Sequence, residues 1–227
     1  VSADAAARIA QRLRRIRGVA HAEPDVMLQA LRTPNDPYYN QQWDYFDPVG
    51  GINLPTAWDQ TAGAAFLTVA VIDTGVRPHS DLASRIVPGY DFVSDPTIAN
   101  DGTGRDADPT DPGDWVTSTE AAFGPLAGCR VTNSSWHGTH VAGTLAAAGD
   151  NSFGIAGVNW GSNLLPVRVL GKCGGYVSDI ADGIRWAAGL PVPNAPSNAH
   201  PARVLTLSLG GGGACSVALQ NAISAAV

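Results

Sequence analysis

Hydrophobic and polar positions along most of the chain form blocks that predict strands followed by helices. Three apolar runs have the composition of strands that are buried on both faces of a sheet. They are residues 64–72, 163–170 and 202–212, the last of which runs into glycines. Three further segments have helical spacing, and they are residues 137–148, 178–189 and 216–227. This alternation predicts an α/β fold with a mostly parallel sheet and helices on both faces.

The first 33 residues follow a different pattern. Residues 4–19 place Ala7, Ile9 and Leu13 on one helical stripe with arginines opposite. A strand is expected over residues 19–31. The arginines could form an anion-binding patch, although a solvated helix face is the simpler interpretation. A segment rich in Pro, Asn and aromatic residues follows and indicates a boundary near residues 32–35, so that residues 1–33 and 34–227 form separate domains.

Length and charge narrow the class of protein. A chain of 227 residues is long enough for one domain with a sizeable core and a small appendage. Its formal charge of −6 is uneven, because residues 1–33 hold six arginines against three acids. The acidic remainder argues against a nucleic-acid partner, and the absence of a long apolar run argues against a membrane span. The chain starts at Val1 without a signal peptide, which suggests a processed or excerpted piece.

The chain has three cysteines, Cys129, Cys173 and Cys215. Cys129 and Cys173 could pair with each other. The odd number implies either a free thiol or a partner outside this chain. Low lysine content and loops rich in Asn and Gly fit a secreted protein, in which disulfides persist.

Two residues have the sequence context of a proton-transfer site. Asp73 closes an apolar strand and is followed by a Thr-Gly turn, at the strand end where α/β sheets gather reactive groups. An isolated Asp at this place could also merely cap a turn. His137 opens a helix of small residues, which allow neighbouring backbone to come close. A proton-carrying histidine needs an acceptor that orients one ring nitrogen, and Asp73 is the natural choice.

A metal site is the competing interpretation of this helix, because His140 follows three residues after His137. That spacing suits a single zinc ion poorly, and neither an H-E-x-x-H motif nor a third histidine is nearby. We therefore expect His140 to be a packed, hydrogen-bonded structural residue.

Three ordered motifs together resemble the subtilisin-like serine proteases, over nearly all of residues 34–227. They are VAVIDTGV, SSWHGTHVAGT and LSLGG. The resemblance implies a doubly covered α/β fold and a secreted endopeptidase. It assigns Asp73 as the triad aspartate and His137 as the general base and acid.

The resemblance also implies a substrate cleft. Ser208, Leu209 and Gly210 match the strand that lines the specificity pocket and pairs with the substrate backbone. Gly174 and Gly175 match the opposing edge, so that a peptide substrate would be added as a strand between them. A simple turn is the alternative interpretation of the two glycines.

Residues 1–33 resemble the C-terminal part of the inhibitory propeptide of these enzymes, with residues 18–28 similar to its closing strand. The propeptide would then be a partner of the catalytic domain. Cleavage is expected near residues 31–34.

Calcium is the cofactor that the resemblance implies. One site is expected from three side chains and three nearby carbonyl groups, and these are Asp36, Asp81 and Asn151 with the carbonyls of Gly149, Phe153 and Ile155. A second site could form in an acidic loop from Asp106, Asp108, Asp111 and Asp114. A solvated acidic loop is the alternative for this second group.

Two expected features of the family do not occur in these 227 residues. The sequence lacks the G-T-S-x-A segment of the nucleophile and the V-V-A-A-G-N segment of the oxyanion-hole asparagine. Without that asparagine the oxyanion loses a donor worth about 3 kcal/mol. We therefore expect the chain alone to be inactive and the fold to be incomplete, with the missing half of the peptidase domain as a partner. The alternative is a non-catalytic binding module that keeps this fold.

Overall fold

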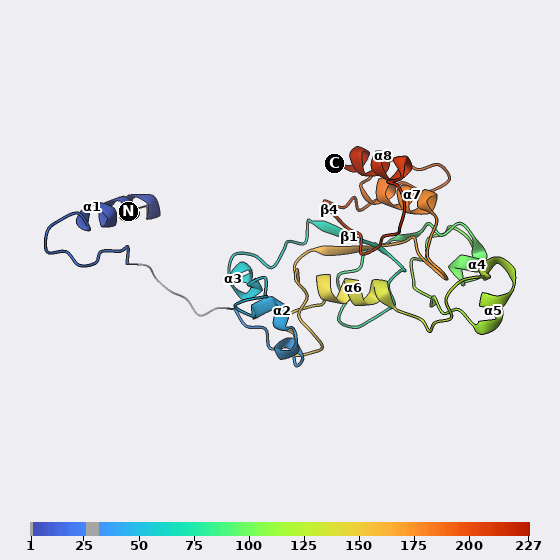
Figure 1. Ribbon diagram of the computed structural model, residues 1–227, viewed down its shortest axis with the longest axis horizontal. Coiled ribbons are helices and arrows are strands. Elements are labelled where there is room, and N and C mark those ends of the chain that lie inside the picture. Colours follow the sequence, from blue (N-terminus) through green and yellow to red (C-terminus); the bar gives the residue numbers. More distant parts are fainter. Residues whose placement is uncertain (1, 26–31) are drawn as a thin grey trace. The chain divides into compact units, whose positions relative to one another are not determined.

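The computed structural model describes residues 2–25 and 32–227, and the chain divides into two compact units, Val1–Leu31 and Arg32–Val227 (Figure 1). In the first unit, helix α1 (Ala3–Leu13) begins after Ser2, whose side chain accepts a hydrogen bond from the Ala5 amide. The predicted strand is wrong for residues 19–25, which are irregular, because no described segment of this unit pairs with them. Its remainder, residues 26–31, lies outside the described residues.

The second unit is built on a parallel sheet, as the apolar runs predict. Its four strands have the order β2-β3-β1-β4, and they are β1 (Thr68–Asp73), β2 (Tyr90–Asp91), β3 (Asn163–Arg168) and β4 (Val204–Thr206). All pairs are parallel, and Asp73 at the end of β1 lies opposite Arg168 at the end of β3. The carboxyl ends of the two central strands, β1 and β3, therefore lie side by side at the same end of the sheet.

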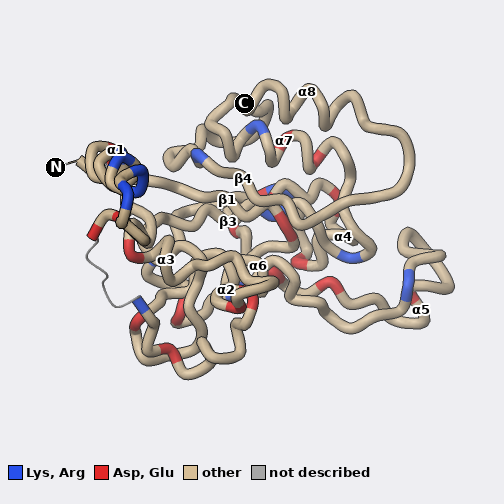
Figure 2. The backbone as a smooth tube through the Cα atoms, turned by 60° about the vertical axis from the view of Figure 1, so that its left-hand side comes forward, with Lys and Arg blue, Asp and Glu red and all other residues tan. Residues whose placement is uncertain are grey.

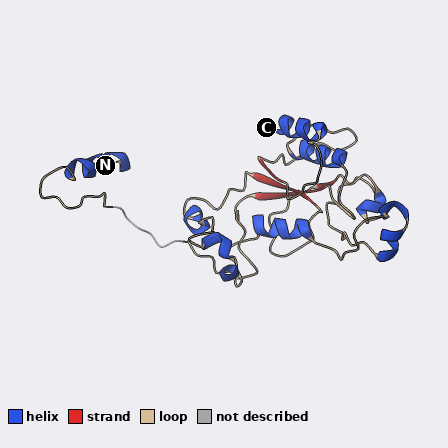
Figure 3. Ribbon diagram, viewed as in Figure 1, coloured by secondary structure: helices blue, strands red, loops and turns tan. Residues whose placement is uncertain are grey.

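Helices cover both faces of this sheet (Figures 1 and 3). Helix α6 (His137–Ala146) lies on one face, and α7 (Val177–Ala187) and α8 (Val217–Ala226) lie on the other. Successive side chains of β1 point to opposite faces of the sheet, and this alternation explains why helices cover both faces. Ala70 and Ile72 pack in the cluster that includes α7, whereas Val71 packs with Ala142 of α6. The predicted α/β class with doubly covered strands is confirmed.

Several short elements escape a periodicity argument because they span only three to five residues. They are η1 (Tyr39–Gln41), α2 (Trp43–Phe46), α3 (Leu54–Trp58), α4 (Pro96–Ala99), α5 (Ser118–Ala122) and η2 (Gly124–Leu126). Side-chain caps fix the start of two of them, Asp95 at α4 and Thr117 at α5. Strand β4 is shorter than predicted, because residues 207–213 run into glycines that form no ladder.

The loop over residues 92–133 is tied to the segment that follows β3. Cys129 and Cys173 form a disulfide, which confirms the pairing, and Cys215 is exposed and free. Beside the disulfide, the Lys172 side chain is 5% exposed and its ammonium group donates to Glu120 at 2.6 Å. Glu120 also accepts from the Thr117 amide and hydroxyl at the start of α5. The loop is therefore held by both covalent and ionic links.

The Lys172–Glu120 pair predicts a contribution to stability that acid removes. Hydrogen bonds from Lys172 and Thr117 lower the pKa of Glu120 from 4.5 to about 2. Because the folded-state pKa lies below the unfolded value, the stabilisation is complete above pH 4.5 and disappears as pH falls through about 2. Glu120→Gln should thus lower the melting temperature at pH 6, and this difference should shrink towards pH 2. A difference independent of pH would contradict this assignment.

Among the residues that the structure describes, no helix combines the length and apolar character that a bilayer crossing requires. Charged residues are spread over the second unit, whereas arginines gather on α1 and directly after it in the first (Figure 2).

Candidate active site

The structure brings Asp73 and His137 together at the carboxyl edge of the sheet. Asp73 is the last residue of β1 and its side chain is 1% exposed, whereas His137 is the first residue of α6 and its side chain is 45% exposed. The His137 Nδ1 atom lies 2.8 Å from Asp73 Oδ1 and 3.0 Å from Oδ2. Glycine is required at position 138, because a Cβ there would collide with the Gly75 carbonyl oxygen.

The hydrogen bonds of Asp73 decide the tautomer of His137. The Asp73 Oδ1 atom also accepts from the Thr74 amide at 2.7 Å, and an ionised carboxylate can only accept. Nδ1 of His137 must therefore carry the proton in this bond, which leaves Nε2 with its lone pair. A histidine held in this way can take a proton from a reacting group at Nε2.

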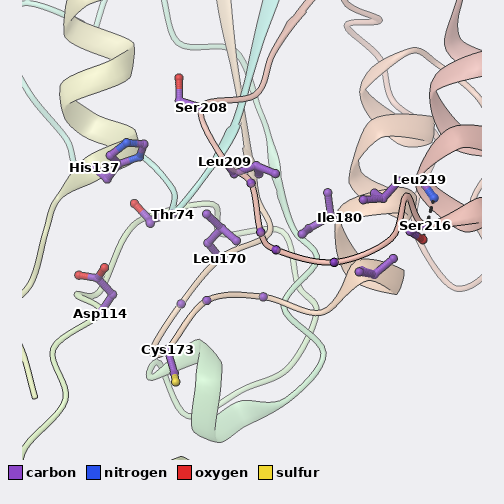
Figure 4. Close-up of a pocket in the computed structure, with 18 of the residues that line it drawn as sticks. Thr74, Asp114, His137, Leu170, Cys173, Ile180, Ser208, Leu209, Ser216 and Leu219 are labelled. Atoms are coloured by element: carbon purple, nitrogen blue, oxygen red, sulfur yellow. Dashed lines mark hydrogen bonds between the residues drawn. The ribbon is translucent and has the colours of Figure 1, made fainter. Parts of the chain in front are cut away.

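His137 lines a pocket of about 1020 Å³. Figure 4 shows His137 and Asp114 on one side of it and Ile180 and Leu219 on the other. All five residues predicted to bind substrate line this pocket, namely Gly174, Gly175, Ser208, Leu209 and Gly210. The alternative interpretation of the glycines also has a basis, because residues 171–174 form a tight turn with amide–carbonyl bonds of 2.9 and 3.1 Å between Gly171 and Gly174.

The side chains of the first predicted calcium site all contact or belong to the loop of residues 149–155. Asp36 is 5% exposed and its Oδ2 accepts from the Asp150 amide at 2.7 Å, whereas its buried Oδ1 has no hydrogen-bond partner. Asp81 is 3% exposed and accepts from Asn151 Nδ2 at 2.9 Å and from the Ile155 amide at 3.4 Å. Two buried carboxylates from distant segments, Asp36 and Asp81, thus reach the loop that carries Asn151.

Two other backbone positions of this prediction belong to the same loop. Phe153 donates its amide to Asn151 Oδ1 at 2.9 Å. Gly149 packs against Trp160, whose ring leaves no space for a Cβ.

The structure does not bring the four carboxylates of the second predicted calcium site together. Within residues 2–25 and 32–227, no three His, Cys, Asp or Glu side chains make a group that could hold a metal. The physical reason is that the four carboxylates bind different neighbours. Asp106 and Asp108 accept from Thr103 and Thr110, Asp111 accepts from Thr74, and Asp114 accepts from Ser135.

The expectation for His140 is also wrong. His140 is exposed, and its ring makes no hydrogen bond within the described part of the chain. No zinc-like cluster includes it among the described residues.

Arg168 and Asp91, a buried ion pair, had no role in the sequence analysis. Arg168 is fully buried at the end of β3, pairs with Asp91 and Asp101, and donates to the Thr74 carbonyl at 3.2 Å. Burial raises the pKa of Asp91 to about 7, and the Arg168 charge limits this rise. An arginine inside the apolar run 163–170 was the available signal, since a buried guanidinium requires partners.

The Subtilase family profile matches residues 66–227. An extracellular protease of Xanthomonas campestris is 51% identical over 92% of this chain and 35% of its own length, and an extracellular basic protease of Dichelobacter nodosus is 45% identical over 90% and 34%. The chain thus spans about a third of these relatives. A solved protease structure from Pseudoalteromonas arctica is 54% identical, with a TM-score of 0.81 over 86% of this chain and 56% of that chain.

Proposed function

The chain belongs to the subtilase family, and from this membership we propose that it is part of a secreted serine endopeptidase. The observation that carries the proposal is the bond between Asp73 and His137 Nδ1 beside a pocket of about 1020 Å³. The related proteases from Xanthomonas campestris and Dichelobacter nodosus are named extracellular, which supports secretion. The nucleophilic serine is proposed to lie outside these 227 residues, since the sequence has no G-T-S-x-A segment.

The proposed chemistry follows from the polarity of the His137 ring. Nε2 accepts the proton of the serine hydroxyl while the serine oxygen bonds to the substrate carbonyl carbon. His137 then returns this proton to the leaving amine as the carbon–nitrogen bond breaks, and a water molecule repeats the sequence to release the acid. Asp73 accepts from Nδ1 throughout and stabilises the imidazolium that forms.

The proposed substrate is an extended peptide. The segment over Ser208–Gly210 and the glycines at positions 174 and 175 line the pocket that also holds His137. At Gly175 a Cβ would collide with the Val169 carbonyl oxygen, so the backbone itself forms this wall. Exposed backbone on two sides of a pocket suits pairing with a peptide strand.

Peptide hydrolysis by the full-length protein tests the proposal. Internally quenched peptides with both ends blocked should be cleaved in the middle, and a serine-directed phosphonate should abolish cleavage. A non-catalytic binding module would bind these peptides without cleaving them. Inhibition by a zinc chelator but not by the phosphonate would favour the metal alternative instead.

We further propose that residues 1–33 are the C-terminal part of an inhibitory propeptide. The division of the chain into units between Leu31 and Arg32 supports this proposal, because it lies close to the expected boundary. The proposed cleavage near residues 31–34 would separate the two units.

A structural Ca²⁺ is proposed at the first predicted site. The buried, unpartnered Asp36 Oδ1 supports it, because a buried carboxylate oxygen needs a cation or a donor. Asp81 and the Asn151 side-chain oxygen would add hard ligands, and carbonyl groups of the 149–155 loop would complete a shell of 6–8 oxygens. The bound ion would join the segment around Asp36 to the core of the domain.

Calcium removal is expected to lower thermal stability. Calcium at 100 times its Kd would stabilise the folded state by about 3 kcal/mol, which corresponds to a melting temperature about 5–10 °C higher. Differential scanning calorimetry with Ca²⁺ and with a chelator should show this difference. Asp36→Asn should abolish it, while Asp44→Asn, which changes an exposed carboxylate of α2, should keep it. Equal melting temperatures with and without calcium would contradict the site.

A further inference from the structure

Thr74 joins the strand of Asp73 to the helix of His137. Its amide donates to Asp73 Oδ1 at 2.7 Å, and its hydroxyl oxygen accepts from the Gly138 amide at 3.0 Å. Gly138 directly follows His137 in the first turn of α6, where amides lack partners within the helix. One residue therefore contacts both Asp73 and the backbone directly after His137, and Figure 4 shows its side chain close to His137.

Asp111 fixes the direction of the Thr74 hydroxyl. Asp111 Oδ2 lies 2.7 Å from Thr74 Oγ1, and Asp111 Oδ1 accepts from the Gly113 amide at 2.8 Å. An ionised carboxylate only accepts, so the single hydroxyl proton of Thr74 must point to Asp111. A lone pair of the hydroxyl oxygen then faces the Gly138 amide. Reversal of the hydroxyl would lose both bonds.

The arrangement is buried and held by the backbone on both sides. Asp111 is 1% exposed and Thr74 is 4% exposed, so neither side chain can replace its bonds with bulk water. The Val76 amide donates to the Pro109 carbonyl at 3.1 Å, which joins the turn after β1 to the loop that carries Asp111. Gly75, with a φ of 98°, allows this approach.

We propose that Asp111 is a positioning residue for the reaction, acting through Thr74 on the placement of His137 against Asp73. The loop over residues 101–114 thus supplies an orienting carboxylate. Asp111 does not touch the reacting atoms. Its contribution is to keep the first turn of α6 at a fixed distance from the end of β1, since small displacements of a catalytic base cost large factors in rate. This inference rests on the proposed peptidase function.

The test compares single and double variants of the full-length enzyme in hydrolysis of a quenched peptide. Thr74→Val keeps the side-chain shape but removes the hydroxyl, and should lower kcat about 10-fold or more with little change in KM. Asp111→Asn should have a similar effect, because an amide offers one acceptor where two bonds must be accepted. The double variant should be no slower than Thr74→Val alone, and Thr74→Ser should restore most of the lost rate.

Two controls separate positioning from folding. Asp108→Asn changes an exposed carboxylate of the same loop and should leave kcat unchanged. Assays run well below the melting temperature of each variant remove the effect of lost stability. Additive losses in the double variant, or variants that lose stability but keep the wild-type kcat, would overturn the inference. An inactive wild-type enzyme would instead contradict the proposed peptidase function.

Discussion

Replacement of His137 by alanine is expected to lower kcat of the full-length enzyme by roughly 10⁵- to 10⁶-fold, with little change in KM. Among the described residues, His137 is the only histidine that lines the pocket, and its Nδ1 is bound by a buried carboxylate. Its loss removes both the base that takes the serine proton and the acid that protonates the leaving amine. Initial rates with a blocked peptide, measured over a range of substrate concentrations, separate kcat from KM.

His140→Ala is the matched control for this result. His140 lies on the same helix three residues later and is exposed. This variant should retain the wild-type kcat, because the His140 side chain that it removes is exposed. A large loss in His140→Ala together with a small loss in His137→Ala would reverse the assignment of the base.

Asp73→Asn is expected to lower kcat by about 10⁴-fold without unfolding the protein. The Thr74 amide donates to Asp73 Oδ1, so the oxygen of the new amide should remain there and its NH₂ group should take the place of Oδ2, 3.0 Å from His137 Nδ1. Nδ1 would then accept, and the ring proton would move to Nε2, where a lone pair is needed. The histidine would be held in place in the wrong tautomer.

Steady-state kinetics of Asp73→Asn and its melting curve should be measured together. The expected result is a near-native melting temperature with a large loss of kcat. A loss of less than 10-fold would show that Asp73 only caps the turn after β1, which is the alternative interpretation of an Asp-Thr-Gly sequence.

The sheet and its covering helices could be predicted because their signals are local. Residues 68–72 of the apolar run at 64–72 are buried and pack on both faces of the sheet, and the helix at 137–148 needs small residues where it packs on β1. Asp73 and His137 could be paired for the same reason, since one ends a strand and the other begins a helix. Short elements such as α4 depend on single caps and leave no periodic pattern.

The roles of the acidic loop could not be predicted from spacing. Asp111 and Asp114 lie three residues apart and look alike in the sequence, yet they bind Thr74 and Ser135. Their partners are 37 and 21 residues away, and only the path of the loop brings them together. The burial of Arg168 beside Asp91 is decided in the same way, by packing between segments distant in sequence.

The central claim is that Asp73 and His137 serve a nucleophilic serine in the remainder of the protein. The most direct test labels the full-length protein with a serine-directed phosphonate and identifies the modified residue by mass spectrometry of its peptides. The account predicts a single labelled serine outside these 227 residues, with labelling abolished in His137→Ala. Labelling of a serine within the chain, such as Ser135 or Ser208, or labelling that persists in His137→Ala, would contradict it.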